Sequence, residues 1–366
     1  MEPDPDGWIE NIRMLSDSAS AVVPSDGTLD RVRAIRFVEP GFSPETWAKM
    51  LDLGWLGILV SEDAGGLGLG LRETVALCSV LGQGVVPEPF IPAVLGLGLL
   101  EKAGLWEELN AGLGGEVLLV AAWQASADGM DPRGGVVVAD GRLSGNKIAV
   151  GGGMGADLFV VTTPEGVTLV PRGAAGLTVT PMQMHDGTFH AHLIFDEVPC
   201  DVHPCIGLDE SLQDAMLLHA GYLLGVSDRA FAITLDYLRT RQQFDAPIGR
   251  FQALQHRATE IKVQLELTRA VIGAAASARD LGGDATRTHM AILRARARAA
   301  GLARLVAREA VQMHGAIGYT DEADIGLFVR KAMVEAGQFA PEYRLRKRFM
   351  DHWDAVMPDH VGTGCT

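Results

Sequence analysis

The spacing of hydrophobic residues changes twice along the chain and divides it into three parts. Residues 1–112 carry apolar residues three and four positions apart, for example at Trp47, Met50 and Leu51, which predicts amphipathic helices. Residues 113–205 contain short runs rich in Val, Thr and Leu, separated by Gly, Asp and Pro, as strands are. Residues 206–366 return to helical spacing. The pattern predicts an α+β protein with an N-terminal helical domain, a middle β-domain and a C-terminal helical domain.

Six runs of the middle part are expected to be strands of a small antiparallel barrel or sandwich. They are 117–123, 136–139, 158–163, 167–170, 177–180 and 190–195. In the last part, long helical stretches with short connections predict an antiparallel four-helix bundle. Its helices are expected at 209–242, 251–281, 284–314 and 322–337.

The glycines between Gly54 and Gly70 resemble a dinucleotide-binding fingerprint at first sight. That motif requires a strand directly before it and an acidic residue about twenty positions later, within a βαβ unit. Here the preceding residues are helical in pattern, and the segment 73–81 that follows is a single short helix without a partner strand. We therefore expect a tight, closely packed loop.

Composition and charge exclude several classes of function. Hydrophobic residues make up 48% of the chain and charged residues 21%, which is typical of a globular protein. The formal net charge is −15 at pH 7, which argues against binding to nucleic acid or to an anionic membrane surface. The arginines of 294–298 and the basic residues of 344–348 are expected to form solvated helix faces.

Cysteine content and the apolar runs favour a cytoplasmic protein. Four cysteines in 366 residues are too few for a disulfide scaffold. Cys200, His203 and Cys205 lie close together but lack the spacing of a zinc site, so no metal is expected. The N-terminus opens with acidic residues, unlike a signal peptide, and the most apolar run, 91–100, is too short to span a bilayer.

One polar turn, Arg239–His256, joins two of the predicted long helices. Pro247 and Gly249 interrupt the helical pattern. The turn is rich in hydrogen-bond donors from arginine and glutamine, and planar guanidinium groups suit a pyrophosphate. A solvated corner between helices is the alternative interpretation of this composition.

At this point the chain resembles the acyl-CoA dehydrogenase family over nearly its whole length. The resemblance rests on four segments in order: 53–58 with 65–70, Gly145-Asn-Lys147, Arg241-Gln-Gln-Phe-Asp-Ala-Pro-Ile-Gly249 with Phe251-Gln252, and Gln312-Met-His-Gly-Ala-Ile-Gly-Tyr-Thr320. It implies FAD as cofactor and α,β-desaturation of an acyl-CoA, with proton removal at Cα and hydride transfer from Cβ to the flavin. It also implies an electron-transfer flavoprotein as electron acceptor.

The reaction needs a carboxylate beside the α-proton, in a dry site. Family members place a Glu at one of two positions, and this sequence has Phe339 at the first and Ala215 at the second. Three displaced acids are the alternatives: Asp214, Glu335 and Glu342. No residue of this chain is therefore assigned a catalytic role.

The resemblance separates the missing residues from those that are kept. In the homomeric family one chain supplies the β-domain motif, a Tyr-Glu-Gly-Thr-type loop and the base. The corresponding stretches here, 121–131 and 337–343, lack those motifs. The neighbouring chain supplies an arginine turn and the last helix connection, and both are present. The residues carried over to FAD binding are Arg241, Phe244, Gln252, Gln312 and Gly315.

We therefore expect a subunit of a heteromeric dehydrogenase, without an active site of its own, that completes the flavin site of a larger catalytic partner in an α₂β₂ assembly. The acyl-CoA would lie mainly in that partner. Two alternatives stay open. The chain is a self-sufficient homomeric dehydrogenase with a displaced base, or it is a flavin-free scaffold or acyl-binding protein on the same fold.

Overall fold

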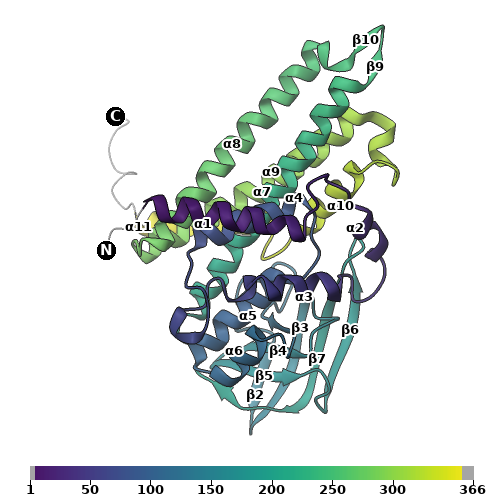
Figure 1. Cartoon of the computed structure of the whole chain (residues 1–366). Helices are drawn as coiled ribbons and strands as arrows, with labels where there is room; N and C mark the ends of the chain where they lie inside the picture. The colour runs from purple at the N-terminus through teal and green to yellow at the C-terminus, as the bar shows by residue number, and fades with distance from the viewer. Residues whose placement is uncertain (1–4, 357–366) are drawn as a thin grey trace.

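A computed structural model describes residues 5–356, so Glu2, Asp4 and Cys365 lie outside the described residues. Figure 1 shows a lower body of short helices and sheets, from which a group of long helices extends. The N-terminal helices are α1 (Pro5–Ser18), α2 (Asp30–Ile35), α3 (Pro44–Asp52), α4 (Leu71–Gln83), α5 (Phe90–Ala103) and α6 (Trp106–Leu113). The predicted architecture of helices, β-domain and helical bundle is confirmed.

Local sequence signals set the limits of helix α3. The Ser43 side chain accepts a hydrogen bond from the backbone N–H of Thr46 at 3.2 Å, and Pro44 occupies the first turn, where its missing N–H costs nothing. Beyond the helix, Gly54 adopts a φ of 70°, a backbone conformation that glycine reaches without strain. The helix buries Trp47 and Met50 against the core.

The glycine loop after Gly54 is closely packed, as predicted. Backbone N–H groups of Leu67 and Leu69 donate to the carbonyl oxygens of Gly57 and Ile58, so the chain folds back on itself. A Cβ atom at Gly66 would lie 2.1 Å from the carbonyl oxygen of Val60. Glycine is thus required by backbone contact, and no βαβ unit surrounds the loop.

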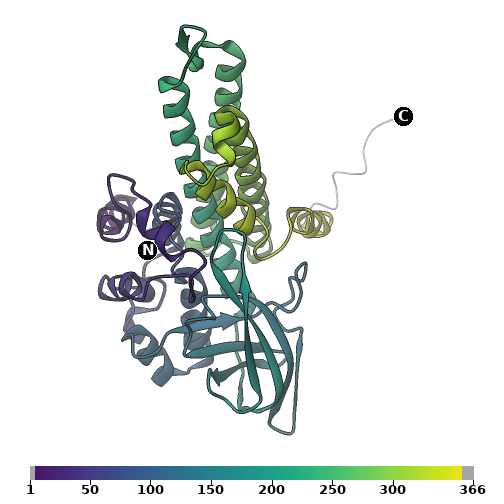
Figure 2. The same ribbon diagram turned by 90° about the vertical axis from the view of Figure 1, so that its right-hand side faces the viewer.

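The middle part forms two four-stranded sheets with strand orders β1-β4-β5-β8 and β2-β3-β7-β6. The strands are β1 (Leu119–Ala122), β2 (Val136–Ala139), β3 (Arg142–Gly151), β4 (Leu158–Thr163), β5 (Gly166–Pro171), β6 (Leu177–Gln183), β7 (Phe189–Pro199) and β8 (Val202–His203). Apolar residues of both sheets share one core. Figure 2 shows the two sheets from the side.

Two details of the strand prediction were wrong. Strand β3 was not among the six runs, because bulges next to Leu143 and after Lys147 break the alternation of buried and exposed residues. The pairing is also not antiparallel throughout, since β1 runs parallel to β4. Between them the chain crosses to the other sheet to form β2 and β3, which allows a parallel return.

The long helices agree with prediction to within a few residues. They are α7 (Leu208–Thr240), α8 (Gln252–Asp280), α9 (Ala285–His314) and α10 (Ile325–Glu335). A further helix, α11 (Glu342–Val356), carries the basic residues that were expected to form a solvated face. Helix α7 is buried along most of its length because it packs against α4 and α9. Among the helices described in residues 5–356, none is long and apolar enough to cross a membrane.

A carboxylate at the end of α8 joins the bundle to the N-terminal helices. Asp280 accepts hydrogen bonds from the backbone N–H groups of Leu71 and Arg72 at 2.7 and 3.1 Å. It also accepts from the Arg72 guanidinium at 3.1 Å. Gly70 precedes these residues and has no side chain with which to cap α4 itself. Asp280 therefore acts as the cap of α4 from another helix.

We expect Asp280→Ala to lower the free energy of unfolding by about 1–2 kcal/mol, because two backbone donors of α4 lose their acceptor. Urea unfolding followed by circular dichroism measures the change. Asp236→Ala removes an exposed ion pair with Arg239 and should change stability by less than about 0.5 kcal/mol. Equal effects of the two substitutions would contradict the capping role.

Candidate functional site

The predicted cofactor-binding turn forms the far end of the α7–α8 hairpin. Helix α7 ends at Thr240, and a two-stranded ribbon of β9 (Gln242–Gln243) and β10 (Ala246–Pro247) follows. Figure 1 shows this ribbon at the end most distant from the sheets. Phe244 and Asp245 adopt φ values of 53° and 62°. Asp tolerates this conformation better than most residues, so the turn forms without the glycine that family members have at 245.

The end of α9 lies against the end of α7 and brings the remaining predicted residues to the same place. The rings of Tyr237 on α7 and His314 on α9 stack with centroids 4.4 Å apart. Gln312 is exposed beside them, and Gly315 has a φ of 67° with open space around its Cα. The structure therefore gathers Arg241, Phe244, Gln252, Gln312 and Gly315 at one end of the bundle.

This end of the molecule is exposed and unusually aromatic. The Phe244 side chain is 86% exposed and Tyr319 is 79% exposed. The Arg241 side chain forms no ion pair or hydrogen bond with any residue described between 5 and 356, whereas Arg239 pairs with Asp236 at 3.1 Å. An unpaired guanidinium beside exposed glutamines fits an anionic ligand presented from outside the chain.

The two stretches expected near a flavin in this chain, 121–131 and 337–343, contact each other directly. The rings of Trp123 and Phe339 stack with centroids 5.4 Å apart and an angle of 20° between their planes. The Arg344 guanidinium donates to the Asp128 carboxylate at 2.6 Å, and this bond lowers the pKa of Asp128. The two stretches thus meet at the Trp123–Phe339 stack, and the first residues of α11 add the contact to Asp128.

A buried lysine holds the first of these stretches. Lys147 is fully buried, and its ammonium donates to the carbonyl oxygens of Trp123, Pro132 and Gly134 at 3.0, 2.9 and 2.7 Å. Burial lowers the pKa of Lys147 to about 7. The backbone that carries the Trp123 ring is therefore tied to the sheet.

A buried arginine holds the second stretch. The prediction of a solvated face at 294–298 was wrong for Arg296, which is fully buried. It donates to the carbonyl oxygens of Glu335 and Gln338, at 2.9 and 2.6 Å. The Glu335 carbonyl belongs to the last residue of α10, where a cation is favourable, and Gln338 lies in the loop that follows. Burial lowers the pKa of Arg296 to about 10. The bonds fix the loop that carries Phe339.

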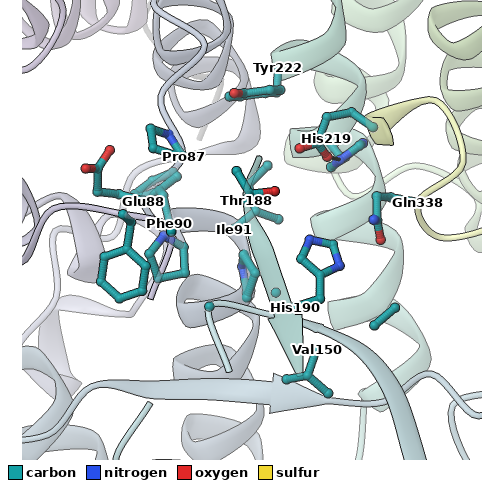
Figure 3. A pocket seen from close by; sticks show the side chains of 18 of the residues that line it. Pro87, Glu88, Phe90, Ile91, Val150, Thr188, His190, His219, Tyr222 and Gln338 are labelled. Atoms are coloured by element: carbon teal, nitrogen blue, oxygen red, sulfur yellow. Dashed lines mark hydrogen bonds and ion pairs between the residues drawn. The ribbon is translucent and has the colours of Figure 1, made fainter. Parts of the chain in front are cut away.

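A cavity of about 120 Å³ lies beside the two rings. Figure 3 shows side chains from the N-terminal helices, β7, α7 and the loop after α10 around it. On one side lies a chain of charged and polar groups. His219 Nε2 lies 2.7 Å from a Glu335 oxygen, Glu335 lies 3.3 Å from Lys331 Nζ, and Lys331 lies 2.5 Å from Asp186. Sequence patterns gave no sign of this group, because its members come from three distant segments: α7, α10 and the turn between β6 and β7.

The three acids considered as displaced bases are all engaged by cations. Asp214 pairs with Arg279 at 2.7 Å, and Glu342 pairs with Arg304 and Arg346. Neither lines the cavity. Only Glu335 does. Burial opposes its ionisation, but the Lys331 charge and the His219 hydrogen bond outweigh burial and lower its pKa.

Burial of two cavity histidines makes the protein sensitive to acid. Burial lowers the pKa of His219 and of His190 from the ordinary 6.5, so both imidazoles are neutral in the folded state. Below pH 6.5 the unfolded chain binds more protons than the folded chain, and stability falls as pH decreases. We expect a loss of about 1 kcal/mol per histidine between pH 7.5 and 5.5.

Urea unfolding at pH 7.5 and pH 5.5 tests this expectation. The double substitution of His190→Gln and His219→Gln should reduce the difference between the two pH values, whereas His256→Gln, at an exposed position, should leave it unchanged. A pH dependence equal in all three proteins would contradict the assignment.

Two family models match this chain, one in its N-terminal part and one in its C-terminal part. The family model for the acyl-CoA dehydrogenase N-terminal domain matches residues 10–105, and that for the C-terminal domain matches residues 209–336. Acyl-CoA dehydrogenase FadE27 of Mycobacterium tuberculosis is 31% identical over 280 residues, which cover 72% of this chain and 74% of that protein. Acyl-CoA dehydrogenase IpdE2 of Mycolicibacterium smegmatis is 28% identical over 334 residues, which cover 91% of this chain and 95% of that protein.

Solved structures give the same result. A variant of the Tcur3481-Tcur3483 steroid ACAD superposes with a TM-score of 0.87 at 26% identity, covering 96% of this chain and all of that one. The ChsE4-ChsE5 complex from Mycobacterium tuberculosis, at 24% identity, shows the same fold with a TM-score of 0.83 over 99% of each chain. PigA, which has the same fold at 20% identity and a TM-score of 0.81, has been solved with FAD and proline. The two terminal matches, the full-length relatives and the shared fold together place this chain in the acyl-CoA dehydrogenase family.

Proposed function

We propose that this chain is the non-catalytic subunit of a heteromeric FAD-dependent acyl-CoA dehydrogenase and completes the flavin site of a larger partner. The contact between Trp123 and Phe339 carries the proposal, because it closes the chain's own cleft where family members hold the ring of the flavin. At the other end of the molecule, the residues that a neighbouring chain contributes to a flavin are exposed.

Size supports the closed state of the cleft. Ligand and cofactor pockets of enzymes usually measure about 300–1,000 Å³. The cavity that remains beside Trp123 and Phe339 has about 120 Å³. The buried cations Lys147 and Arg296 hold both sides of the contact, so opening it would break several hydrogen bonds to backbone carbonyls.

The available carboxylates do not suit the reaction. A general base works best when its pKa lies near the pH at which it acts. Glu335 is the one displaced acid at the cavity, and the Lys331 charge together with the His219 hydrogen bond holds its pKa well below the ordinary value. Such a carboxylate is a weak base. The base that removes the α-proton is therefore assigned to the partner.

The exposed end of the bundle supplies the contacts to the partner's cofactor. A bound FAD would supply the acceptor for the hydride that leaves the β-carbon of the acyl-CoA. Arg241 suits its pyrophosphate as a charge-assisted donor, and Gln312 suits a neighbouring phosphate or ribose hydroxyl. Phe244, Gln252 and Gly315 shape the surface around them. Asp245 stands where family members have glycine, and its positive φ keeps the same turn possible.

Relatives indicate the class of partner and substrate. The solved neighbours include the paired ChsE4-ChsE5 chains and a protein described as a steroid ACAD. An α₂β₂ assembly that desaturates the acyl-CoA of a steroid or lipid side chain follows by analogy, with the acyl group mainly in the partner. An electron-transfer flavoprotein is the proposed electron acceptor.

The substitution Arg241→Ala should weaken FAD retention in the complex by about 10- to 100-fold, because one charge-assisted hydrogen bond to a phosphate is lost. Release of FAD on dilution of the purified complex, followed by flavin fluorescence, measures the change. Arg239→Ala is the matched control, because this arginine lies two residues away and is 72% exposed in its own ion pair. Full FAD occupancy of the Arg241→Ala complex at dilute protein would contradict the proposal.

The chain purified alone should be colourless and should not reduce an electron acceptor with acyl-CoA. Co-expression with a larger homologous chain should give one FAD per heterodimer, counted from the flavin absorbance. A yellow, active protein from the single chain would instead support a homomeric dehydrogenase, with Glu335 as the residue to test. A colourless complex with the partner would support a flavin-free scaffold.

A further inference from the structure

The cavity beside Trp123 and Phe339 has features that the proposed function does not explain. It lies in the body of the protein, between the N-terminal helices, the sheets and α7, whereas the exposed end of α7 and α8 lies away from the body (Figures 1 and 3). Its volume of about 120 Å³ is close to that of an engineered cavity of roughly 150 Å³ that binds benzene. A molecule with one six-membered ring is therefore the size that fits.

Most of the cavity wall is apolar. Leu81, Phe90, Ile91, Val150 and Phe189 line it, and all are buried. They come from helices α4 and α5 and strands β3 and β7, so rigid elements support the wall on several sides. Such a wall favours a hydrocarbon ring over water, because transfer of apolar surface out of water is favourable.

One part of the wall is polar and contains unpaired nitrogen atoms. His219 Nε2 faces the ionised Glu335 at 2.7 Å and therefore carries the ring proton, which leaves a lone pair on Nδ1. His219 Nδ1 and His190 Nδ1 are both buried and have no hydrogen-bond partner in the part of the chain that the structure describes. In Figure 3 the His190 ring points toward the side of the cavity where His219 and Gln338 lie.

Glu88 adds a further acceptor at the cavity. One of its oxygens accepts from Arg31 at 2.5 Å and from the backbone N–H of Ser43 at 3.1 Å. Its other oxygen is buried without a partner among the described residues. Unpaired buried polar atoms are uncommon in proteins and call for a partner such as a ligand. His219 Nδ1 and the free Glu88 oxygen are acceptors, so the partner that satisfies them must donate a proton.

The charges around the cavity exclude an anion. Three carboxylates, Asp186, Glu335 and Glu88, face two cations, and both cations are already bound to them: Lys331 to the first two and Arg31 to the third. The two imidazoles are neutral. An added carboxylate or phosphate would meet no free cation and would be repelled, because like charges in a buried site interact strongly.

We propose that this cavity is a binding site for a small, uncharged, ring-sized apolar molecule that carries one hydroxyl group. The hydroxyl hydrogen is donated to an imidazole nitrogen of the His190 and His219 pair, and the ring packs against the apolar wall. The inference goes beyond the proposed function and does not depend on the partner or on flavin. Failure of FAD binding and failure of this site are therefore measured separately.

Binding of three probes of one size to the full chain tests the proposal. Phenol carries the ring and the hydroxyl, toluene replaces the hydroxyl by a methyl group, and benzoate carries a negative charge. We expect phenol to bind about tenfold more tightly than toluene, which corresponds to one net hydrogen bond, and benzoate not to bind. Isothermal titration calorimetry or ligand-detected NMR measures the affinities.

Two substitutions locate the binding. His190 makes no side-chain hydrogen bond within the described residues, so His190→Leu removes the polar group without breaking an internal bond. It should abolish the preference for phenol over toluene while toluene still binds. Ile91→Trp fills the cavity and should abolish binding of both. Circular dichroism confirms that each variant is folded.

Three results would overturn the proposal. If phenol binds no more tightly than toluene, the imidazoles do not accept a hydrogen bond from the ligand. If benzoate binds more tightly than phenol, the charge argument is wrong. Unchanged phenol binding in the folded Ile91→Trp protein would show that the probe binds elsewhere. The ratio of phenol to toluene affinity, measured on the unmodified chain, tests the proposal even if a variant fails to fold.

Discussion

The stacking of Trp123 on Phe339 is the contact on which the rest of this structure depends. It joins the residue after strand β1 to the loop that follows α10, and both rings line the same cavity. At each stretch, a buried basic side chain donates hydrogen bonds to backbone carbonyl oxygens near the ring. Because Lys147 and Arg296 each donate more than one hydrogen bond to backbone carbonyl oxygens, a movement of either stretch would leave a buried cation with fewer partners.

Helix α7 links the cavity in the body of the protein to the exposed end of the bundle. Helix α7 has 33 residues, which corresponds to a length of about 50 Å at 1.5 Å per residue. It runs from the body of the protein, where His219 and Tyr222 face the cavity, to the turn that carries Arg241. A single helix therefore connects the cavity of this chain with the surface proposed to contact the cofactor of another chain.

The internal charge group sets the acid–base properties of the cavity. Glu335 is surrounded by Lys331 and His219, so its negative charge is already neutralised and its affinity for a proton is low. A catalytic carboxylate requires the opposite environment, apolar and without a cation, which raises its pKa toward neutrality. Under the proposed function, Glu335 orients the His219 imidazole, and a carboxylate of the partner removes the proton.

The sequence by itself determined the α+β architecture, the four long helices to within a few residues and the position of the Arg239–His256 turn between two of them. These features depend on local periodicity and on Pro and Gly, whose backbone restrictions act wherever they occur. Strand β3 escaped prediction because its bulges disturb the alternation on which strand recognition rests. Only the tertiary structure decided that Trp123 meets Phe339, that Asp280 caps a distant helix, and that His190, His219, Lys331 and Glu335 surround one cavity. These contacts join residues up to 216 positions apart, and their geometry follows from the packing of whole elements, which no local pattern encodes.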